Sequence, residues 1–308
     1  MAFDFDAAVK APFRMQPGLR RMAAGSAHLT PLAPGARHQR EKLAVLSAFW
    51  PQALCLQPGF DAGPALHALC AHAAAEQPQA WAWDGERAQA LGTAVTRDGQ
   101  VEQTARGSFG LGDEVLRCLQ GLPAEWRLAG LLSLTFAEDF ALVDGRSSTI
   151  PWLAVALPSH WAPELKIGLH FTQVHAPVAD NDLLLKASAA LLRTVTAGER
   201  WERFVWNVTD QPRLHAHPAR SGGRRWEHTA IHQGWWRTER QTFVPLPSAE
   251  QAVFTISVDV QPLAAAIASA PRAAALHAAI ASMTPAVLAY RGLTAVREPL
   301  LAWLAQRA

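Results

Sequence analysis

The chemistry that this chain could carry is concentrated in two segments. The segment from 158 to 178, PSHWAPELKIGLHFTQVHAPV, contains His175 just before a proline. The second segment, WWRTERQTF at 235–243, packs two arginines, a glutamate and a glutamine between bulky apolar residues. A histidine that could reach a metal, together with polar groups that need a reason to be buried, is typical of a cofactor site.

His175 falls on an apolar face whether the segment is counted as a helix or as a strand, and Phe171 shares that face in both cases. We expect a helix that begins at Pro163 and is stopped by Pro177. A neutral imidazole in an apolar wall is a good iron ligand, and Gly168 leaves space beside it for a flat macrocycle. A hydrogen-bonded core histidine is the alternative interpretation.

The charged run at 237–242 reads as a strand, on which successive side chains point to opposite faces. Alternation places Arg237, Glu239 and Gln241 on one face and Thr238, Arg240 and Thr242 on the other. One of these faces must look inward, and a pocket that holds an anionic group would supply a partner for the charges. The alternative is an edge strand with internal ion pairs. Arg203 and Trp206, on the preceding strand, could face the same space.

The other candidate residues are weaker. Glu138 and Asp139 could be acid–base groups, but a solvated turn is the simpler interpretation. His215 and His217 form an HxH pair, with His228 and His232 nearby, in a segment that reads as an exposed loop, where solvated histidines are expected. The sequence contains no G-x-S-x-G or HExxH motif, which argues against serine and zinc hydrolases.

Composition narrows the class further. The net charge is +2, from 28 basic and 26 acidic residues, which gives no electrostatic reason to expect nucleic acid. The three cysteines form neither a zinc spacing nor a CxxCH motif, so any haem would be held non-covalently. The N-terminal segment lacks the pattern of a secretory signal, and a cytoplasmic location is expected.

The hydrophobic pattern predicts an α+β fold: an antiparallel sheet flanked by helices, with helical extensions at both ends. Helices are expected at 37–50, 64–76, 111–122 and 180–195, and two more after 262. A loop or irregular hairpin is expected at 81–99, and a long exposed loop at 212–230. Strands are expected from Leu128 onward, within 128–146 and at 152–158, 202–210, 234–247 and 252–260. No domain boundary is evident, so residues 1–308 are expected to form one domain.

Several of these motifs, in this order, resemble the haem-dependent oxidative N-demethylase alpha-subunit family. They are PFRMQPGLRRM (12–22), REKLAVL (40–46), FAEDFALV (136–143), PSHWAPELKIG (158–168), VHAPV (174–178), ERFVW (202–206), RTERQTF (237–243) and AYRG (289–292). The resemblance implies a PAS-like domain that binds haem b. It implies oxidative N-demethylation of a small secondary or tertiary amine by O₂, with release of formaldehyde.

The resemblance also implies site residues and partners. His175 would be the axial iron ligand, and Arg237, Glu239 and Arg240 would be catalytic. The cofactor would be bound by His175, Lys166, Gly168, Phe171, Arg203, Trp206 and Gln241. Electrons would come from a separate flavin and iron–sulfur reductase subunit, because this chain has neither a dinucleotide fingerprint nor the cysteines for a cluster. No membrane or nucleic-acid partner is implied. A non-catalytic haem protein of the same fold, binding a gas as a sensor, is the alternative.

The chain departs from the family pattern at three places. Val205 stands where a polar residue, often Asn, is usual, and Val244–Pro245 follow the RQT segment where basic residues are usual. PELK at 163–166 replaces a direct Glu–Lys pair. The substrate need not be the dimethylated amine that the resemblance suggests.

Overall fold

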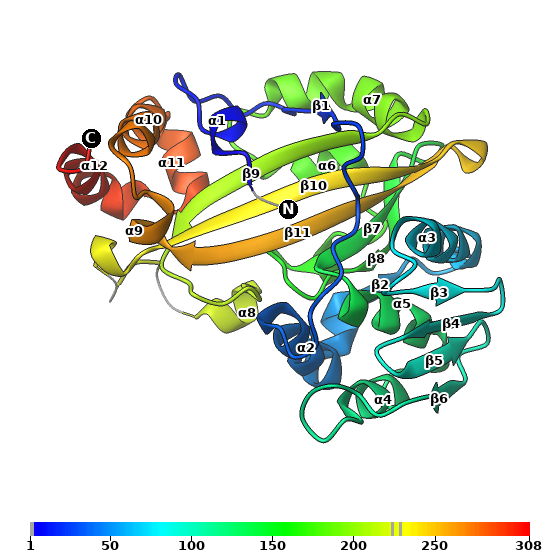
Figure 1. Ribbon diagram of the computed structural model, residues 1–308. Helices are drawn as coiled ribbons and strands as arrows, with labels where there is room; N and C mark the ends of the chain where they lie inside the picture. The colour runs from blue at the N-terminus through cyan, green and yellow to red at the C-terminus, as the bar shows by residue number, and fades with distance from the viewer. Residues whose placement is uncertain (1–2, 223–224, 228–229) are drawn as a thin grey trace.

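The chain folds around a seven-stranded antiparallel sheet with the order β1-β9-β10-β11-β7-β8-β2. A computed structural model describes residues 3–222, 225–227 and 230–308. Figure 1 shows β9, β10 and β11 as the long strands that cross the centre of the molecule. The strands are β1 (Arg20–Arg21), β2 (Leu54–Leu56), β7 (Glu138–Asp144), β8 (Thr149–Ala154), β9 (Trp201–Thr209), β10 (Trp235–Leu246) and β11 (Gln251–Pro262). The predicted α+β class is confirmed.

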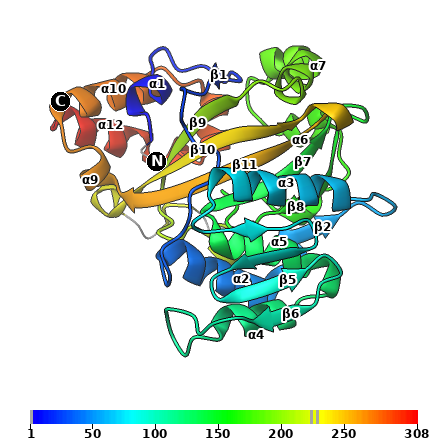
Figure 2. The ribbon, with the colours of Figure 1, turned by 45° about the vertical axis from the view of Figure 1, so that its right-hand side comes forward.

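A second, four-stranded sheet lies beside α4 and α5 (Figure 2). It consists of β3 (Ala82–Trp83), β4 (Arg87–Ala90), β5 (Thr93–Thr96) and β6 (Val101–Gln103). The sequence analysis expected only a loop or irregular hairpin here, because each strand is too short to show alternation. Gly92 makes the turn between β4 and β5 possible: its φ is +71°, and a Cβ there would lie 2.5 Å from the carbonyl oxygen of Ala105.

Twelve α-helices and four 3-10 turns are assigned in the described residues. The helices are α1 (Phe5–Ala8), α2 (Arg37–Ala53), α3 (Gly63–Glu76), α4 (Glu114–Gln120), α5 (Ala124–Thr135), α6 (Phe171–His175), α7 (Asp182–Thr196), α8 (Pro218–Ser221), α9 (Leu263–Ala266), α10 (Ala270–Ala281), α11 (Pro285–Arg291) and α12 (Arg297–Ala305). The 3-10 turns are η1 (Pro163–Leu165), η2 (Ile231–Gln233), η3 (Pro247–Ala249) and η4 (Thr294–Val296). The helices predicted near α2, α3, α4 and α7 are confirmed, α4 being shorter than expected.

α5 corrects the prediction that strands begin at Leu128. Every residue from Leu128 to Thr135 is buried, so the helix has no polar face to reveal a 3.6-residue period. A continuous apolar run of this kind fits a buried strand or a buried helix equally well. The helix contacts β7 and β8, and Trp126 stacks on Trp152 with ring centroids 6.2 Å apart.

The two faces of the large sheet are covered to different extents. On the packed face, side chains such as Trp206, Trp236, Thr242, Thr255 and Phe140 are buried. The opposite face, here called the open face, is lined along β9, β10 and β11 by Arg203, Val205, Asn207, Gln241, Phe243 and Phe254, all half-buried. Half-exposed side chains in the middle of a seven-stranded sheet indicate a face that this chain does not fully cover.

Glu138 and Asp139 lie inside β7 and are buried, so the prediction of a solvated turn is wrong. Asp139 pairs with the ammonium group of Lys42 at 3.1 Å and accepts a hydrogen bond from the backbone N–H of Leu157. Lys42 also donates to the carbonyl oxygens of Phe136 and Glu138. This ion pair joins α2 to the sheet through the core, where an unpaired charge is very costly.

The C-terminal region forms four helices, where the sequence analysis expected two. Pro285 begins α11, and Gly292 ends it with a φ of +68°. α9 to α12 pack on the ends of β9 and β10 in a cluster with Trp206 and Trp236. In the described part of the chain, no single helix has the length and apolar character needed to cross a bilayer; α10 and α11 reach them only as a pair bent by 114°.

We predict that Lys42→Met lowers the free energy of unfolding by about 3–5 kcal/mol, because the buried Asp139 carboxylate loses its ion-pair partner. Denaturant unfolding followed by circular dichroism measures the change. Lys10→Met, at an exposed position, is the control and should stay within about 0.5 kcal/mol of the unsubstituted protein. An equally small effect for Lys42→Met would contradict a core ion pair.

Candidate functional site

His175 lies at the end of a single helical turn, α6, instead of the long helix expected from the sequence. η1 forms where that helix was expected to begin, but Gly168 then adopts a φ of +70° and interrupts it. The N–H of Gly168 donates to the carbonyl oxygen of Ile150, so the chain pairs with the start of β8 before it turns into α6. The predicted helix is therefore wrong, because backbone pairing with the sheet edge competes with helix formation.

The segment before α6 is fixed to the open face by apolar packing. Ile167 and Trp161 pack on a small cluster that includes Ala141, Leu153 and the half-buried Phe254. The strand register puts these last three side chains on the same face as Gln241 and Arg203. α6 is consequently held over the open face and not over the packed one.

The imidazole of His175 is in the form that can bind a metal. Its Nδ1 lies 2.8 Å from the carbonyl oxygen of Phe171, a contact that requires Nδ1 to carry the proton. Nε2 is then unprotonated and has a free lone pair. Burial lowers the pKa of His175, and the positive charges of Arg203 and Lys166 lower it further. The Phe171 ring, with its centroid 4.2 Å from that of the imidazole, limits its rotation.

A row of polar side chains faces this histidine from β9 and β10. Arg203 is directly opposite Gln241 in the strand register, and Glu239 is two residues further along β10 on the same face. Gln241 Nε2 donates to the carboxylate of Glu239 at 2.5 Å. Electrostatic attraction links Glu239 to Arg203 across the strands. The predicted alternation along β10 is confirmed.

Two positive charges lie close enough to the His175 imidazole to lower its pKa. Within the described residues, the Arg203 guanidinium makes no hydrogen bond and no ion pair closer than 4 Å. The Lys166 ammonium group donates to the carbonyl oxygen of Val174 at 3.3 Å, and burial lowers its pKa. Cations with unused donors beside a half-covered surface are suited to bind the carboxylates of a ligand.

Arg237 shares this face but its donors are already used. Its guanidinium donates to Ser159 Oγ at 2.7 Å and to the carbonyl oxygens of Leu157, Pro158, Arg213 and Leu214. It is 2% exposed. Arg237 therefore joins two loops to β10, and each of its three nitrogens already donates to the protein.

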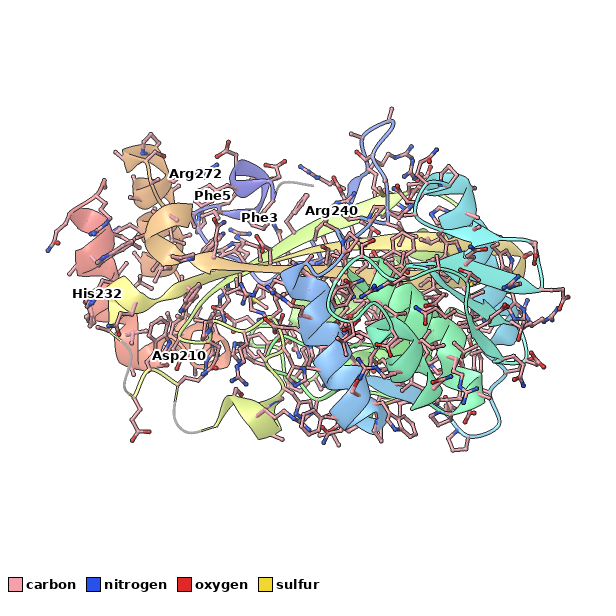
Figure 3. The ribbon with its side chains drawn as sticks, turned by 60° about the horizontal axis from the view of Figure 1, so that its bottom comes forward. Phe3, Phe5, Asp210, His232, Arg240 and Arg272 are labelled. Atoms are coloured by element: carbon pink, nitrogen blue, oxygen red, sulfur yellow. The ribbon has the colours of Figure 1, made fainter. Side chains whose placement is uncertain are left out.

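Arg240 and Trp206 lie on the packed face, on the other side of the sheet from His175. Arg240 pairs with Glu202 at 2.9 Å and donates to the carbonyl oxygen of Ala27. Trp206 stacks on Trp236 with ring centroids 5.2 Å apart. Figure 3, in which β10 and β11 are seen nearly edge-on, shows Arg240 on the same side of the sheet as Phe3. These residues are not brought to the open face, and we leave both out of the site.

His215 and His217 are not solvated, which corrects the prediction for these two residues, whereas His232 is exposed as expected. His217 is buried; its Nδ1 accepts from the N–H of Ala219, and its Nε2 donates to Glu164 at 3.1 Å. His215 stacks on His217 and contacts the carbonyl oxygen of Ala156 through Nδ1. His228 lies outside the described residues. The two histidines of the HxH pair therefore hold this loop in place, because each ring makes a hydrogen bond to a neighbouring segment.

Two residues that the sequence analysis did not select belong to this face. Asn207 lies two positions beyond Val205 on β9; it donates to the carbonyl oxygen of Arg291, and its own side-chain oxygen is buried without a hydrogen bond. Tyr290 is close enough to Glu239 and Arg203 for their charges to act on its hydroxyl. Counting alternate residues from Arg203 would have found Asn207. For Tyr290, the only indication in the sequence was that it belongs to the AYRG motif.

The fold and the site thus define an α+β protein in which a neutral histidine faces a half-exposed, positively charged sheet face. A sequence model of the haem-dependent oxidative N-demethylase, alpha subunit-like family matches residues 116–301. The match covers more than half of the chain, and the protein belongs to this family. The resemblance seen in the sequence motifs is confirmed, and the matched range includes every residue of the open face described above.

The residues present fit a haem group. His175 offers a lone pair on Nε2 and has its other nitrogen fixed by a carbonyl, an arrangement typical of metal-binding histidines. Arg203 and Lys166 provide positive charge for propionates, and the half-buried Phe243 and Phe254 provide apolar contact. All three cysteines are buried, and burial raises the pKa of Cys55 to about 12, which disfavours the reactive thiolate form of that residue.

We predict that Arg237→Lys lowers the free energy of unfolding by about 2–4 kcal/mol and leaves the spectrum of added haem unchanged. Lysine keeps the charge but has three donors for five acceptors, so charge-assisted bonds worth about 1.5–3 kcal/mol each are lost. Denaturant unfolding and visible absorption are the measurements, with the exposed Arg193→Lys as control. Unchanged stability with an altered haem spectrum would assign Arg237 to the cofactor instead.

We predict that the stability of the fold depends on pH through His160. Burial, with the charges of Arg225 and Arg237, lowers its pKa to about 3. In the unfolded chain its pKa is about 6.5. Between these values the unfolded state binds more protons, so stability falls as the pH drops from about 6.5 toward 3.

His160→Asn removes this titration and tolerates the positive φ of 62° at that position. The slope of unfolding free energy against pH between 6.5 and 4 should decrease by about one proton in the variant. His232→Asn, at an exposed site, should keep the original slope. Equal slopes in all three proteins would show that His160 titrates normally in the fold.

Proposed function

We propose that this protein is a haem-dependent oxygenase subunit that catalyses oxidative N-demethylation of a small secondary or tertiary amine. The observation that carries the proposal is the state of His175: a neutral imidazole with Nδ1 bonded to a carbonyl and with Arg203, on the half-covered sheet face, close enough for its charge to lower the pKa of the ring. The family assignment supports haem as the group that covers it. When bound, the haem iron would supply O₂ activation and oxidation of the N-methyl group, with formaldehyde as product.

His175 would hold the iron through Nε2, and Arg203 and Lys166 would hold the propionates. Arg203, on β9, is suited to this role because the two arginines of β10, Arg237 and Arg240, already have partners. Gly168, with no side chain, would allow the ring to approach the chain before α6, and the Phe171 ring would keep the imidazole in one orientation. The haem would be haem b, bound without a covalent bond.

Glu239 and Gln241 would bind the amine. Methylated amines are positively charged at neutral pH, and a carboxylate on the same face as Arg203 is the available acceptor. Val205 is directly opposite Glu239 across the strands, so the position that is often Asn in the family presents an apolar surface here. We infer that the site accepts an amine with a larger apolar substituent than dimethylamine.

The remaining features of the proposal follow the family. The seven-stranded sheet with flanking helices would be one PAS-like domain spanning residues 1–308. Electrons would reach the iron from a separate flavin and iron–sulfur reductase subunit, and the family name, alpha subunit-like, supports a multi-subunit enzyme. The cytoplasmic location expected from the sequence stays a prediction.

We predict that His175→Ala abolishes the iron coordination seen in the haem-loaded protein. Absorption spectra of the ferric, ferrous and ferrous–CO forms are the measurement, because the Soret and visible bands report the axial ligand. His232→Ala, an exposed histidine, is the control and should leave all three spectra unchanged. Identical spectra for His175→Ala and the unsubstituted protein would show that another residue binds the iron.

We predict that Glu239→Gln weakens binding of methylated amines about tenfold or more, because a charge-assisted hydrogen bond is worth about 1.5–3 kcal/mol. Titration of the haem absorption bands with a series of methylated amines gives the dissociation constants. The spectrum without amine should be unchanged, which separates this effect from haem loss. Glu125→Gln, at an exposed position, is the control. Unchanged amine affinity in Glu239→Gln would remove Glu239 from the amine site.

A further inference from the structure

A second group of possible metal ligands lies away from the open face. It consists of His28, in the segment before α2, and His72 and Glu76, one turn apart on α3. The residue before His28, Ala27, accepts a hydrogen bond from Arg240, which lies on the packed face. The group is therefore on the opposite side of the sheet from His175, and its analysis does not depend on the proposed function.

The three side chains have the spacing of ligands around one ion. One ligand atom from each residue can be chosen so that all three lie within 4.8 Å of one another. His28 Nδ1 is 3.2 Å and His72 Nε2 is 3.5 Å from the same oxygen of Glu76. Two ligands at zinc distances of 2.0–2.2 Å in a tetrahedral arrangement are about 3.4 Å apart. The two distances to Glu76 match this value, and all three ligand atoms lie within 4.8 Å of one another.

The hydrogen bonding around the group is incomplete. His72 Nε2 is buried and has no hydrogen-bond partner, although it faces the Glu76 carboxylate. His28 is 1% exposed, and its Nε2 also has no partner. Unsatisfied buried nitrogen atoms are rare in folded proteins and need an explanation. A cation between His72 and Glu76 would give His72 Nε2 a partner, and His28 would bind it through Nδ1, the nitrogen that faces Glu76.

The Glu76 carboxylate is already held in place by its neighbours. It accepts hydrogen bonds from the backbone N–H groups of His28 and Leu29, and both histidine rings approach one of its oxygens. The carboxylate and the two rings therefore converge on one point without a change of the backbone.

One positive charge competes for this site. Arg200 Nη2 lies 3.6 Å from the carboxylate of Glu76 and 3.4 Å from His28 Nδ1. Its side chain is 40% exposed, and a buried nitrogen of its guanidinium lacks a partner. Nη2 also donates to the carbonyl oxygen of Ser26, so the guanidinium must give up this bond to turn toward solvent when a metal binds.

We propose that His28, His72 and Glu76 form a site for a divalent transition-metal ion of the zinc type, which ties the chain at residues 27–29 to α3. Two imidazoles and a carboxylate are preferred by zinc over calcium or magnesium. Three protein ligands leave a fourth position open for water. Glu76 already holds this segment by bonds from the N–H groups of His28 and Leu29 at 2.8–2.9 Å, so the metal would reinforce an existing connection.

The test is a calorimetric titration of the haem-loaded, chelator-treated full chain with Zn²⁺. We expect one tight equivalent in the unsubstituted protein and its loss in His72→Ala. His72 makes no other hydrogen bond among the described residues, so this change should not disturb the fold, which a thermal melt verifies. His67→Ala is the matched control, because His67 is on the same helix but stacks on Trp83. It should keep the tight equivalent.

Arg200→Ala is the second variant to be titrated with Zn²⁺. If Arg200 competes with the metal, its removal should tighten Zn²⁺ binding by roughly tenfold, the effect of removing a unit charge about 4 Å away in partly screened surroundings. Absence of a tight equivalent in both the unsubstituted protein and Arg200→Ala would overturn the proposal. Equal loss in His72→Ala and His67→Ala would also overturn it, because the binding would then belong to surface histidines.

Discussion

The arrangement of the site depends on β10 being hydrogen-bonded along both edges. β9 and β11 pair with it in continuous register, from Trp235 to Phe243 on one side and to Leu246 on the other. This pairing fixes which residues of the charged run face His175. A shift of one residue would exchange the two faces and bring Arg240 to the site in place of Gln241.

The buried charges of the sheet consequently divide into two groups. Arg237 and Arg240 have their donors bound to loops and to Glu202, and the resulting bonds join distant segments to β10. Lys42 does the same for α2 through Asp139. Burying these ions is tolerable because each has an oppositely charged or hydrogen-bonding partner. Arg203 differs, since its half-buried guanidinium faces a surface that a ligand can cover. The contrast in partners, more than the residue type, separates structural from functional arginines here.

The proposed haem and metal sites lie on opposite faces of the same strands. The haem face depends on β9 and β10 through Arg203, Glu239 and Gln241. On the other side, Arg240 of β10 holds the carbonyl of Ala27, next to His28. A metal ion bound by His28 would therefore rigidify a segment attached to the strand that carries the haem face. The two sites share a scaffold while using separate ligands.

The sequence by itself determined the α+β class, the central strands, the helices near α2, α3, α4 and α7, and the alternation along β10. These features rest on local periodicity and on caps, which are properties of short segments. It did not determine α5 or the buried state of Glu138, because fully buried elements lose the polar face that periodicity requires. Only the tertiary structure decided which arginine is free and that His28 meets Glu76 across 48 residues, since a side chain's partners come from segments far away in the chain.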